Sequence, residues 1–442
     1  MKKTLVFVLL ALTFTTAFTG FSTVKGATQA EIDASVAKGV AWLASVQEAD
    51  GSWDPNYYPI GATGLALLKL ETHAVLLGMS PFDPNYIYHD NVSKGLDYLF
   101  ANAQIIPIGK QQHGPNLDDP DSDGDGIGVW FPGSSENNYN TALALIAIVS
   151  STTPNKVVNV LGSPVNGWTY LAVARGVMDY LAYAQADSGP SMGGWWYGPV
   201  NNDTGADQSN SGFVCFALLF AEAPLVNPPQ IGGFGIPIPA FVKTLLNSWV
   251  GYIQNTGGGA EDGGAGYMDP VLWVNIYKTG HLIQQMSFLG DTSTTPRVTR
   301  ALDYLDRHWN DLDTDPGWRG SSPPSNYLAT LMVMKGLVTL GIQTIGGTDW
   351  FDDFATTIIA QQNPDGSWPT SYWGDPILST EWALLTLQKA VPLTKHEVPV
   401  GGQVAATDKL EILSANATVT MTAIALLAAA ATTMVIIAKK KY

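Results

Sequence analysis

The chain has 442 residues, and its 38 acidic residues outnumber its 22 basic residues, which gives a formal net charge of −16. An acidic surface repels nucleic acid and anionic lipid head groups, so we expect no nucleic-acid partner. The single cysteine, Cys215, excludes a disulfide framework and a cysteine-rich zinc site. Its neighbours in SGFVCFALLF predict a small core residue.

The first 26 residues have the order of a secretory signal peptide. Lys2 and Lys3 precede an apolar run at 5–12, and small residues follow at 23–28. We therefore expect cleavage between Thr19 and Ala27 and export of the rest of the chain.

The other end of the chain is typical of a membrane anchor. Residues 415–438 are 24 residues without a charge, long enough at about 1.5 Å per residue to cross a bilayer. The lysines at 439–441 predict that residues 439–442 are a cytoplasmic tail. A buried core helix and a tail removed on lipid anchoring are the alternatives. We expect a single-pass protein of the cell membrane, with a linker at 393–414 and an extracellular N-terminal part.

Between these ends one two-helix unit recurs. KGVAWLASVQEADGSW at 38–53 and FATTIIAQQNPDGSW at 354–368 each combine a helical apolar period with a final Gln, an Asp-Gly turn and a Trp. We trace six units over 28–392, with insertions in units two and three. Their first helices end at these positions: Gln47, Gln104, Gln185, Gln254, near His308, and Gln361 or Gln362.

The second helix of each unit is apolar nearly all round, as in YNTALALIAI at 139–148, and begins with a polar capping residue. The first helices keep a polar face. Because a helix that is apolar on all sides belongs inside, the pattern predicts an all-α closed double ring, with six helices inside and six outside.

The Gln-x-x-Asp-Gly-Ser-Trp turn, preceded by Lys-Gly and a helix, resembles the QW repeat of squalene and oxidosqualene cyclases. It is similar also to the repeats of protein prenyltransferase β subunits. The resemblance covers about 30–390 and implies an (α/α)6 toroid. It also implies structural roles for Gln47 with Trp53, and for Gln361 or Gln362 with Trp368, in which Gln caps a helix and the Trp ring stacks on it.

The chemistry of those families does not carry over. Where the cyclases have DxDD, unit one has Ile60 to Thr63, and no other unit restores the motif. Where the prenyltransferases have Asp-x-Cys for zinc, Phe213 precedes Cys215 by two residues. The resemblance therefore implies a fold and no reaction, and we expect neither zinc nor a nucleotide cofactor.

Acids stand near the starts of the predicted inner helices and form a candidate rim. The weak catalytic candidates are Asp207, Asp375 and Glu381. The weak ligand-binding candidates are Glu136, Trp195, Asp269, His281 and Trp373. Alternatively, acids at helix N-termini only interact with the helix dipole, at about 0.3–1 kcal/mol each. Asp311, Asp313 and Asp315 either bind a cation or form a turn.

The sharpest motif is NLDDPDSDGDGIGVW at 116–130, an insertion in unit two. Asp119, Asp121, Asp123 and Asp125 alternate before glycine, as in the first half of a calcium loop. The Glu at the twelfth position of an EF-hand is missing. The motif predicts calcium bound with further ligands from elsewhere, and a solvated acidic loop is the alternative.

Three functions remain. The preferred one is a membrane-anchored, calcium-stabilised extracellular domain that binds a lipid, a glycan or a surface protein. The alternatives are a cyclase-type enzyme with a non-standard acid and a glycan-active hydrolase or lyase with a carboxylate pair. A closed apolar cavity favours a lipid, an open cleft with two facing carboxylates favours a glycan, and a filled ring leaves only surface binding.

Overall fold

The computed structural model describes residues 26–54, 56–113, 116–133, 137–198 and 205–393. The predicted signal peptide, apart from Gly26, and the predicted anchor at 415–438 lie outside these residues, as does Glu136. No helix among the described residues combines the length and the apolar character that a membrane crossing requires. The chain divides into a first unit that ends at Pro392 and a second, 393–442, of which only Leu393 is described.

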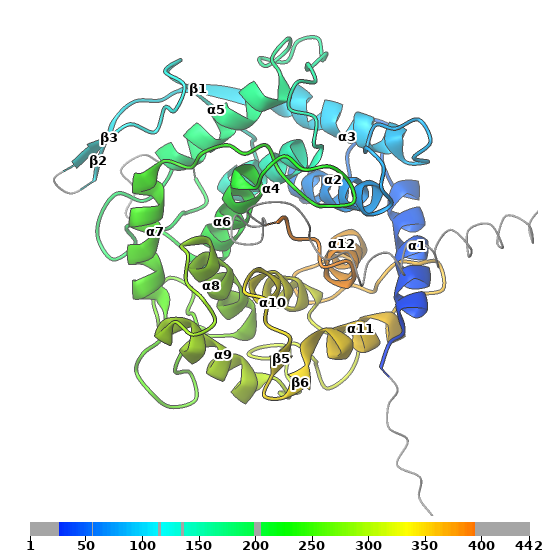
Figure 1. The fold of residues 1–442 in the computed structure, drawn as a ribbon, viewed down its shortest axis with the longest axis vertical. Coiled ribbons are helices and arrows are strands. Elements are labelled where there is room, and N and C mark those ends of the chain that lie inside the picture. The colour runs from blue at the N-terminus through cyan, green and yellow to red at the C-terminus, as the bar shows by residue number, and fades with distance from the viewer. Residues whose placement is uncertain (1–25, 55, 114–115, 134–136, 199–204, 394–442) are drawn as a thin grey trace, which may run out of the picture. The chain divides into compact units, whose positions relative to one another are not determined.

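The helices of the first unit form two concentric rings (Figure 1). The outer ring consists of α1 (Gln29–Ser45), α3 (His89–Asn102), α5 (Tyr170–Tyr183), α7 (Ala240–Ile253), α9 (Pro296–His308) and α11 (Trp350–Ala360). The inner ring consists of α2 (Pro59–Leu76), α4 (Asn137–Ser150), α6 (Gln208–Glu222), α8 (Ile276–Phe288), α10 (Tyr327–Thr339) and α12 (Pro376–Leu387). Each inner helix packs on the next, and α12 packs on α2, so the inner ring is closed. The predicted double ring of six helix pairs is confirmed for the described residues.

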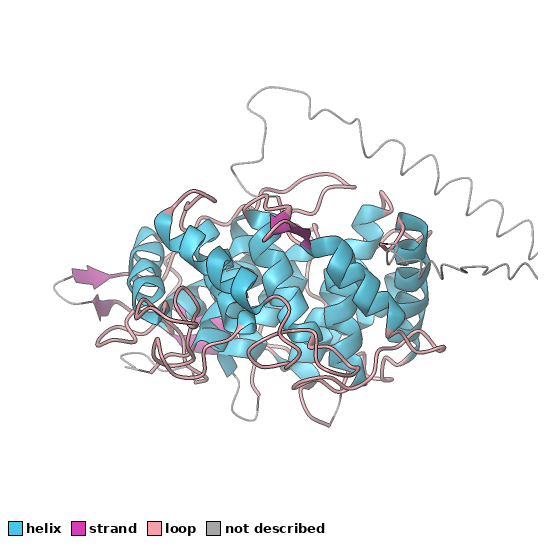
Figure 2. Cartoon of the chain, turned by 90° about the horizontal axis from the view of Figure 1, so that it is seen from below, coloured by secondary structure: helices cyan, strands magenta, loops and turns pink. Residues whose placement is uncertain are grey.

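Burial explains why the two kinds of helix occupy different rings. The outer helix α9 buries one stripe, consisting of Val298, Ala301, Tyr304 and Leu305. The inner helix α4 is buried without interruption from Asn140 to Ser150. Figure 2 shows the ring from the side: the helices stand side by side, and the connecting loops lie at the two ends of the helices.

Three short antiparallel strand pairs, which the all-α prediction omitted, lie in the connections. β1 (Gln104–Pro107) pairs with β4 (Ile127–Trp130), and β2 (Gln111–His113) pairs with β3 (Asn116–Asp118). β3 and β4 lie within the insertion of unit two at 116–130, and β1 and β2 lie in the segment just before it. β5 (Thr344–Ile345) pairs with β6 (Thr348–Asp349) just before α11. The Asp-rich turn is therefore held between strands rather than hanging as a free loop.

The repeated glutamine links neighbouring units. The side-chain amide of Gln47 donates to the carbonyls of Gly51 in its own turn and of Asn91 in α3. Gln362 does the same across the seam of the ring, because its amide donates to Gly366 and to Ser35 in α1. Gln362, and not Gln361, is therefore the equivalent of Gln47. Gln185 and Gln254 repeat the arrangement.

The tryptophan of each complete turn binds both helices of its unit. The indole N–H of Trp368 donates to the carbonyl of Ile358 in α11 at 2.7 Å, and its backbone N–H donates to the hydroxyl of Thr380 in α12 at 2.9 Å. Trp53 and Trp195 make the equivalent pairs of bonds. These residues are structural, because a buried indole N–H needs such a partner.

Glycines allow α8 and α10 to approach closely, and this approach can be tested. A Cβ on Gly280 would lie 2.5–2.7 Å from backbone atoms of Met332 and Val333. We expect Gly280→Ala to lower the free energy of unfolding by about 1–3 kcal/mol, because backbone cannot move as a side-chain end can. Gly251→Ala is the control: no atom lies within 4 Å of its Cβ position on α7, and alanine should stabilise that helix by about 0.5–1 kcal/mol. Urea unfolding measures both, and equal effects would contradict the close packing.

Candidate functional site

A cavity of about 310 Å³ lies at the N-terminal end of the inner ring. All six inner helices contribute to its lining, for example Ala62 of α2, Phe213 of α6 and Leu328 of α10. Half of the lining side chains are aromatic: Tyr58, Tyr139, Tyr197, Phe213, Tyr267, Trp273, Tyr277, Tyr372, Trp373 and Trp382. A cavity of this volume and composition is at the small end of the usual range for ligand sites.

The first turn of α2 is part of the wall of this cavity. Gly61 and Ala62, which belong to the segment Ile60 to Thr63 that the sequence resemblance placed at the DxDD motif, are both part of the lining. Because both residues are small, they leave space for the cavity, and neither provides a carboxyl group. Among the described lining residues there is no aspartate or glutamate.

The mouth of the cavity is formed by exposed aromatic side chains. Trp273 and Trp373 are 43% and 67% exposed, and their rings lie 6.4 Å apart. Both residues have left-handed backbone, with φ of +57° and +62°. Left-handed backbone is unfavourable for a bulky residue and tends to occur where function requires it. Further exposed apolar residues precede Trp273 in sequence: Met268, Val271 and Leu272.

One carboxylate organises this mouth. Asp315 accepts hydrogen bonds from the indole N–H of Trp273 and from the amide of Asn275, the latter at 2.9 Å. The hydroxyl of Tyr372 also donates to Asp315, at 3.4 Å. Trp273, Asn275 and Tyr372 all line the cavity. Asp315, which the sequence suggested as a cation ligand or turn former, is thus a positioning residue for the mouth.

Lys278 is the cationic residue of the described lining. Its nitrogen lies 4.5 Å from the ring centre of Trp273 and 5.6 Å from that of Tyr277, within the range of cation–π attraction. Burial lowers the pKa of Lys278 to about 8, against the opposing effects of Asp315 and Asp207. The side chain is therefore mostly charged at pH 7, and its charge is held inside an aromatic enclosure.

The catalytic candidates lie outside the lining. Asp207 is fully buried as the N-cap of α6 and accepts backbone N–H bonds from Ser209 and Asn210 at 2.7 and 2.8 Å. Asp375 caps α12 by accepting from the N–H of Leu378 at 2.8 Å. Both carboxylates therefore satisfy helix ends, as the dipole alternative predicts.

Glu381 is different, because it is fully buried and neither carboxylate oxygen has a hydrogen-bond partner among the described residues. Burial, and then the charges of Asp375 and Asp54, hold its pKa well above the usual range. Burial and Asp375 likewise raise the pKa of Asp54 to about 6. The surroundings of Glu381 therefore favour its neutral form, and the residue stands one position before Trp382 of the lining.

The described ligand-binding candidates lie in different places, and only one of them lines the cavity. Trp373 lines the cavity, whereas Trp195 is fully buried in the repeat and takes no part in the lining. Asp269 accepts backbone N–H bonds in the exposed turn beside the mouth. His281 is buried beneath the cavity, with its Nδ1 2.9 Å from the nitrogen of Lys335. Burial, and then the charge of Lys335, hold the pKa of His281 well below its usual range.

Sequence reasoning missed Lys278, because a lysine in an inner helix was treated as part of an apolar run. Lys69 and Lys335 also stand on inner helices and are fully buried. The signal that could have found them is a lysine in a helix that is otherwise apolar all round.

The four proposed calcium ligands do not all lie together. Asp119 lies 3.8 Å from Lys110, and Asp125 accepts a hydrogen bond from the N–H of Ile127. Asp121 and Asp123 lie close to each other.

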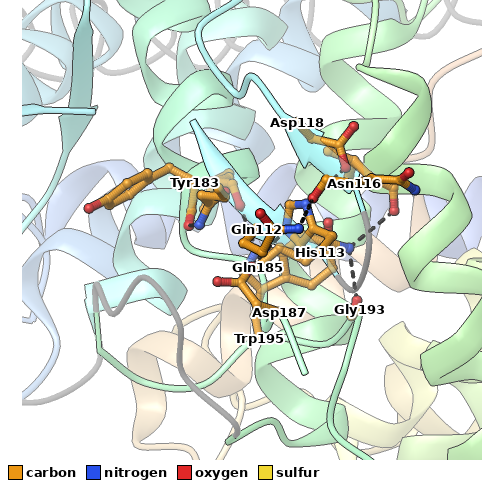
Figure 3. A network of polar contacts seen from close by, with 12 residues as sticks. Gln112, His113, Asn116, Asp118, Tyr183, Gln185, Asp187, Gly193 and Trp195 are labelled. Atoms are coloured by element: carbon orange, nitrogen blue, oxygen red, sulfur yellow. Dashed lines mark hydrogen bonds and ion pairs between the residues drawn. The ribbon is translucent and has the colours of Figure 1, made fainter. Parts of the chain in front are cut away.

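The β2–β3 hairpin, which leads into the insertion of unit two, is clamped to the outer ring through His113 (Figure 3). Its Nδ1 lies 3.0 Å from Asp118 in β3, and its Nε2 lies 2.7 Å from Asp187, which follows α5. The imidazole also stacks on Phe241 of α7, with ring centres 5.2 Å apart. Burial opposes the charge of His113, but the hydrogen bonds to Asp187 and Asp118 outweigh it and raise the pKa.

This clamp predicts a pH effect on stability. Because the pKa of His113 is higher in the folded than in the unfolded chain, its contribution is complete below about pH 6.5 and is lost as the pH rises through the folded pKa. We expect the difference in Tm between the wild type and His113→Gln to be larger at pH 6 than at pH 8.5. Thermal unfolding followed by circular dichroism measures it, and a difference that grows with pH would contradict the clamp.

Comparisons with known proteins were made for the sequence and for the fold. No protein-family model matches the chain. No curated protein matches it either. Among solved structures, the chain is similar to the type II terpene cyclase MstE from Scytonema in its apo form, with 15% sequence identity and a TM-score of 0.46. The match covers 82% of this chain and 99% of that one.

Proposed function

We propose that the protein binds one small anionic amphiphile, that is, a molecule with an apolar or aromatic body and one negative group, in the cavity of the inner ring. The observation that carries the proposal is Lys278, whose charge lies in a lining that is otherwise mostly aromatic and aliphatic, with Asn140, Ser209 and Asn275 as neutral polar residues. The body of the ligand would replace water against the aromatic faces, and its negative group would pair with the ammonium group.

The charge of Lys278 decides between ligand classes. An aromatic enclosure on its own suits a cationic ligand. Here the enclosure already holds the lysine nitrogen, 4.5 Å from Trp273, so a second cation would be repelled. The N-terminal ends of α2, α8 and α10, whose N-cap residues are not carboxylates, add partial positive charge beside the cavity, which also favours a negative group.

A glycan is less well suited to this site. Glycoside hydrolysis uses two carboxyl groups about 5–9.5 Å apart on either side of the bond. The described part of the lining contains neither aspartate nor glutamate. Its aromatic rings and Leu65, Leu143, Leu328 and Leu378 suit an apolar body instead. The expected anchor at 415–438 would keep the protein at a membrane, where amphiphiles are abundant.

The test uses two fluorescent probes that differ in one group. 1-Anilinonaphthalene-8-sulfonate has an aromatic body with a negative sulfonate, and N-phenyl-1-naphthylamine has the same body without it. We expect the wild-type full chain to bind one sulfonate probe per chain, and more tightly than the neutral probe. Ala62→Phe and Leu65→Trp place a ring in the cavity and should abolish binding of both probes, with circular dichroism showing that the fold is kept. Unchanged binding by both variants would refute the cavity as the site.

A second candidate function is a cyclase-type enzyme that protonates an alkene. The observation in its favour is Glu381, a buried acid next to Trp382 whose pKa is raised by burial and by two further carboxylates. Incubation of the full chain with squalene, followed by gas chromatography and mass spectrometry, tests it. A cyclised product that Glu381→Gln abolishes would favour the enzyme over the binding protein.

A further inference from the structure

Three carboxylates converge where the Asp-rich turn of unit two meets α5. One carboxylate oxygen from each of Asp121, Asp123 and Asp179 lies within 4.8 Å of the other two. Asp121 and Asp123 belong to the turn between β3 and β4, whereas Asp179 belongs to an outer helix of the ring. The group therefore joins an insertion to the ring itself, and it lies apart from the cavity.

Asp179 distinguishes this group from an ordinary acidic surface. Its side chain is fully buried, and Oδ1 accepts a hydrogen bond from the N–H of Ser122 at 3.1 Å. Oδ2 has no hydrogen-bond partner among the residues that the structure describes. A buried carboxylate oxygen without a partner is unfavourable, and two further acids beside it increase the cost. Arg175 lies one turn earlier on α5 and is exposed. Burial and then the charge of Asp125 raise the pKa of Asp123, and the positive charge of Arg175 opposes these larger effects.

The turn holds Asp121 in place by its own hydrogen bonds, whereas Asp123 is exposed. The two oxygens of Asp121 accept the N–H groups of Gly124 and Gly126, each at 2.8 Å. Both glycines have left-handed backbone, with φ of +82° and +74°, which lets the chain fold tightly around Asp121. Each oxygen of Asp121 keeps a second lone pair for another partner.

We propose that Asp121, Asp123 and Asp179 bind one calcium ion, which fastens the Asp-rich turn to α5. Oxygens that bind the same Ca²⁺ at 2.3–2.6 Å lie at most about 5 Å apart, and the three carboxylates meet this limit. Mg²⁺ is the poorer fit, because it demands near-ideal octahedral geometry and gives up its waters reluctantly, whereas Ca²⁺ accepts an irregular shell of several carboxylates. Carbonyl groups and water complete the shell. Asp179 takes the place that the sequence motif assigned to Asp119 and Asp125.

The proposed ion would also stabilise one side of the ring. The turn leads directly into β4, which packs on α5. The next residue, Phe131, donates its N–H to the hydroxyl of Thr141 in α4 at 2.9 Å. Tyr139 and Leu143 of the cavity lining belong to α4. A calcium ion in the turn would therefore stabilise the position of α4 through β4 and Phe131.

The test is calorimetric titration of the full chain, freed of metal with EDTA, with calcium chloride. We expect one ion per chain for the wild type, and an affinity at least about tenfold lower for Asp179→Asn and for Asp123→Asn. Asp119→Asn and Asp125→Asn are the matched controls from the same turn and should change the affinity by less than about threefold, because neither belongs to the group.

Thermal unfolding of the same proteins separates loss of the ion from loss of the fold. In EDTA, Asp179→Asn should melt at least as high as the wild type, because one of three repelling carboxylates is gone. In calcium, the wild type and Asp119→Asn should gain in Tm, and Asp179→Asn should not. The proposal is overturned if the wild type binds no calcium at millimolar concentration, if the controls lose as much affinity as Asp179→Asn, or if Asp179→Asn melts lower by the same amount with and without calcium.

Discussion

Replacing Trp368 with alanine is expected to lower the free energy of unfolding by about 3–5 kcal/mol. The indole is fully buried, and its N–H bonds to the carbonyl of Ile358. It also packs against Gly39 of α1, where a Cβ would lie 2.8 Å from the ring. Trp368 therefore holds α11, α12 and the first outer helix together at the seam where the ring closes. Its loss leaves a large void at the contact between units one and six, which no direct chain connection joins.

Trp373, only five residues later, is the control for this prediction. It is 67% exposed and lines the mouth of the cavity, so alanine there should change the free energy of unfolding by no more than about 0.5 kcal/mol. Loss of its aromatic face should instead weaken probe binding by roughly three- to tenfold. Urea unfolding and fluorescence titration distinguish the two tryptophans. Equal destabilisation by the two substitutions would mean that the division between structural and mouth residues is wrong.

Replacing Lys278 with methionine is expected to weaken binding of the sulfonate probe by roughly 10- to 100-fold, as for the loss of a charge-assisted hydrogen bond. Methionine keeps most of the volume and removes the charge, so binding of the neutral probe should stay the same or improve. Lys278→Arg keeps the charge and should keep binding of the sulfonate probe. A loss of both probes in Lys278→Met would show that lysine shapes the cavity and does not select the ligand.

The pH dependence follows from the pKa of about 8 for Lys278. The lysine is protonated below that pH, and only the protonated form attracts the sulfonate. The affinity of the wild type for the sulfonate probe should therefore be constant near pH 6–7 and fall by up to about tenfold per pH unit above pH 8. The neutral probe, and the sulfonate probe with Lys278→Arg, should show no such fall, which fluorescence titration at several pH values can check.

The double ring could be predicted from the sequence, because its signals are local and repeated. The run from Val36 to Leu43 has the apolar period of an outer helix, and the Asp-Gly turn before Trp53 marks its end. The uninterrupted burial of α4 follows in the same way from its unbroken apolar sequence. The strands of unit two were missed, because β1 and β4 are only four residues each and are separated by the whole acidic turn.

The site could be predicted only in part, because it is assembled across the ring. Trp373 was recognised as an aromatic residue near a helix start, and the structure places it at the mouth. Asp315 and Trp273 are 42 positions apart in the sequence, and their contact depends on how two turns meet. Asp179 likewise lies 57 positions from Ser122, inside a helix whose pattern gives no sign of a ligand. Local motifs identify the acidic turn, but not the partner that completes it.

The most direct test of the proposed function is a crystal structure of the full chain with bound 1-anilinonaphthalene-8-sulfonate. We predict one probe in the cavity of the inner ring, with its rings against Trp273 and Tyr139 and a sulfonate oxygen about 3 Å from the nitrogen of Lys278. A probe bound only outside the ring, or bound in the cavity with its sulfonate turned away from Lys278, would contradict the account.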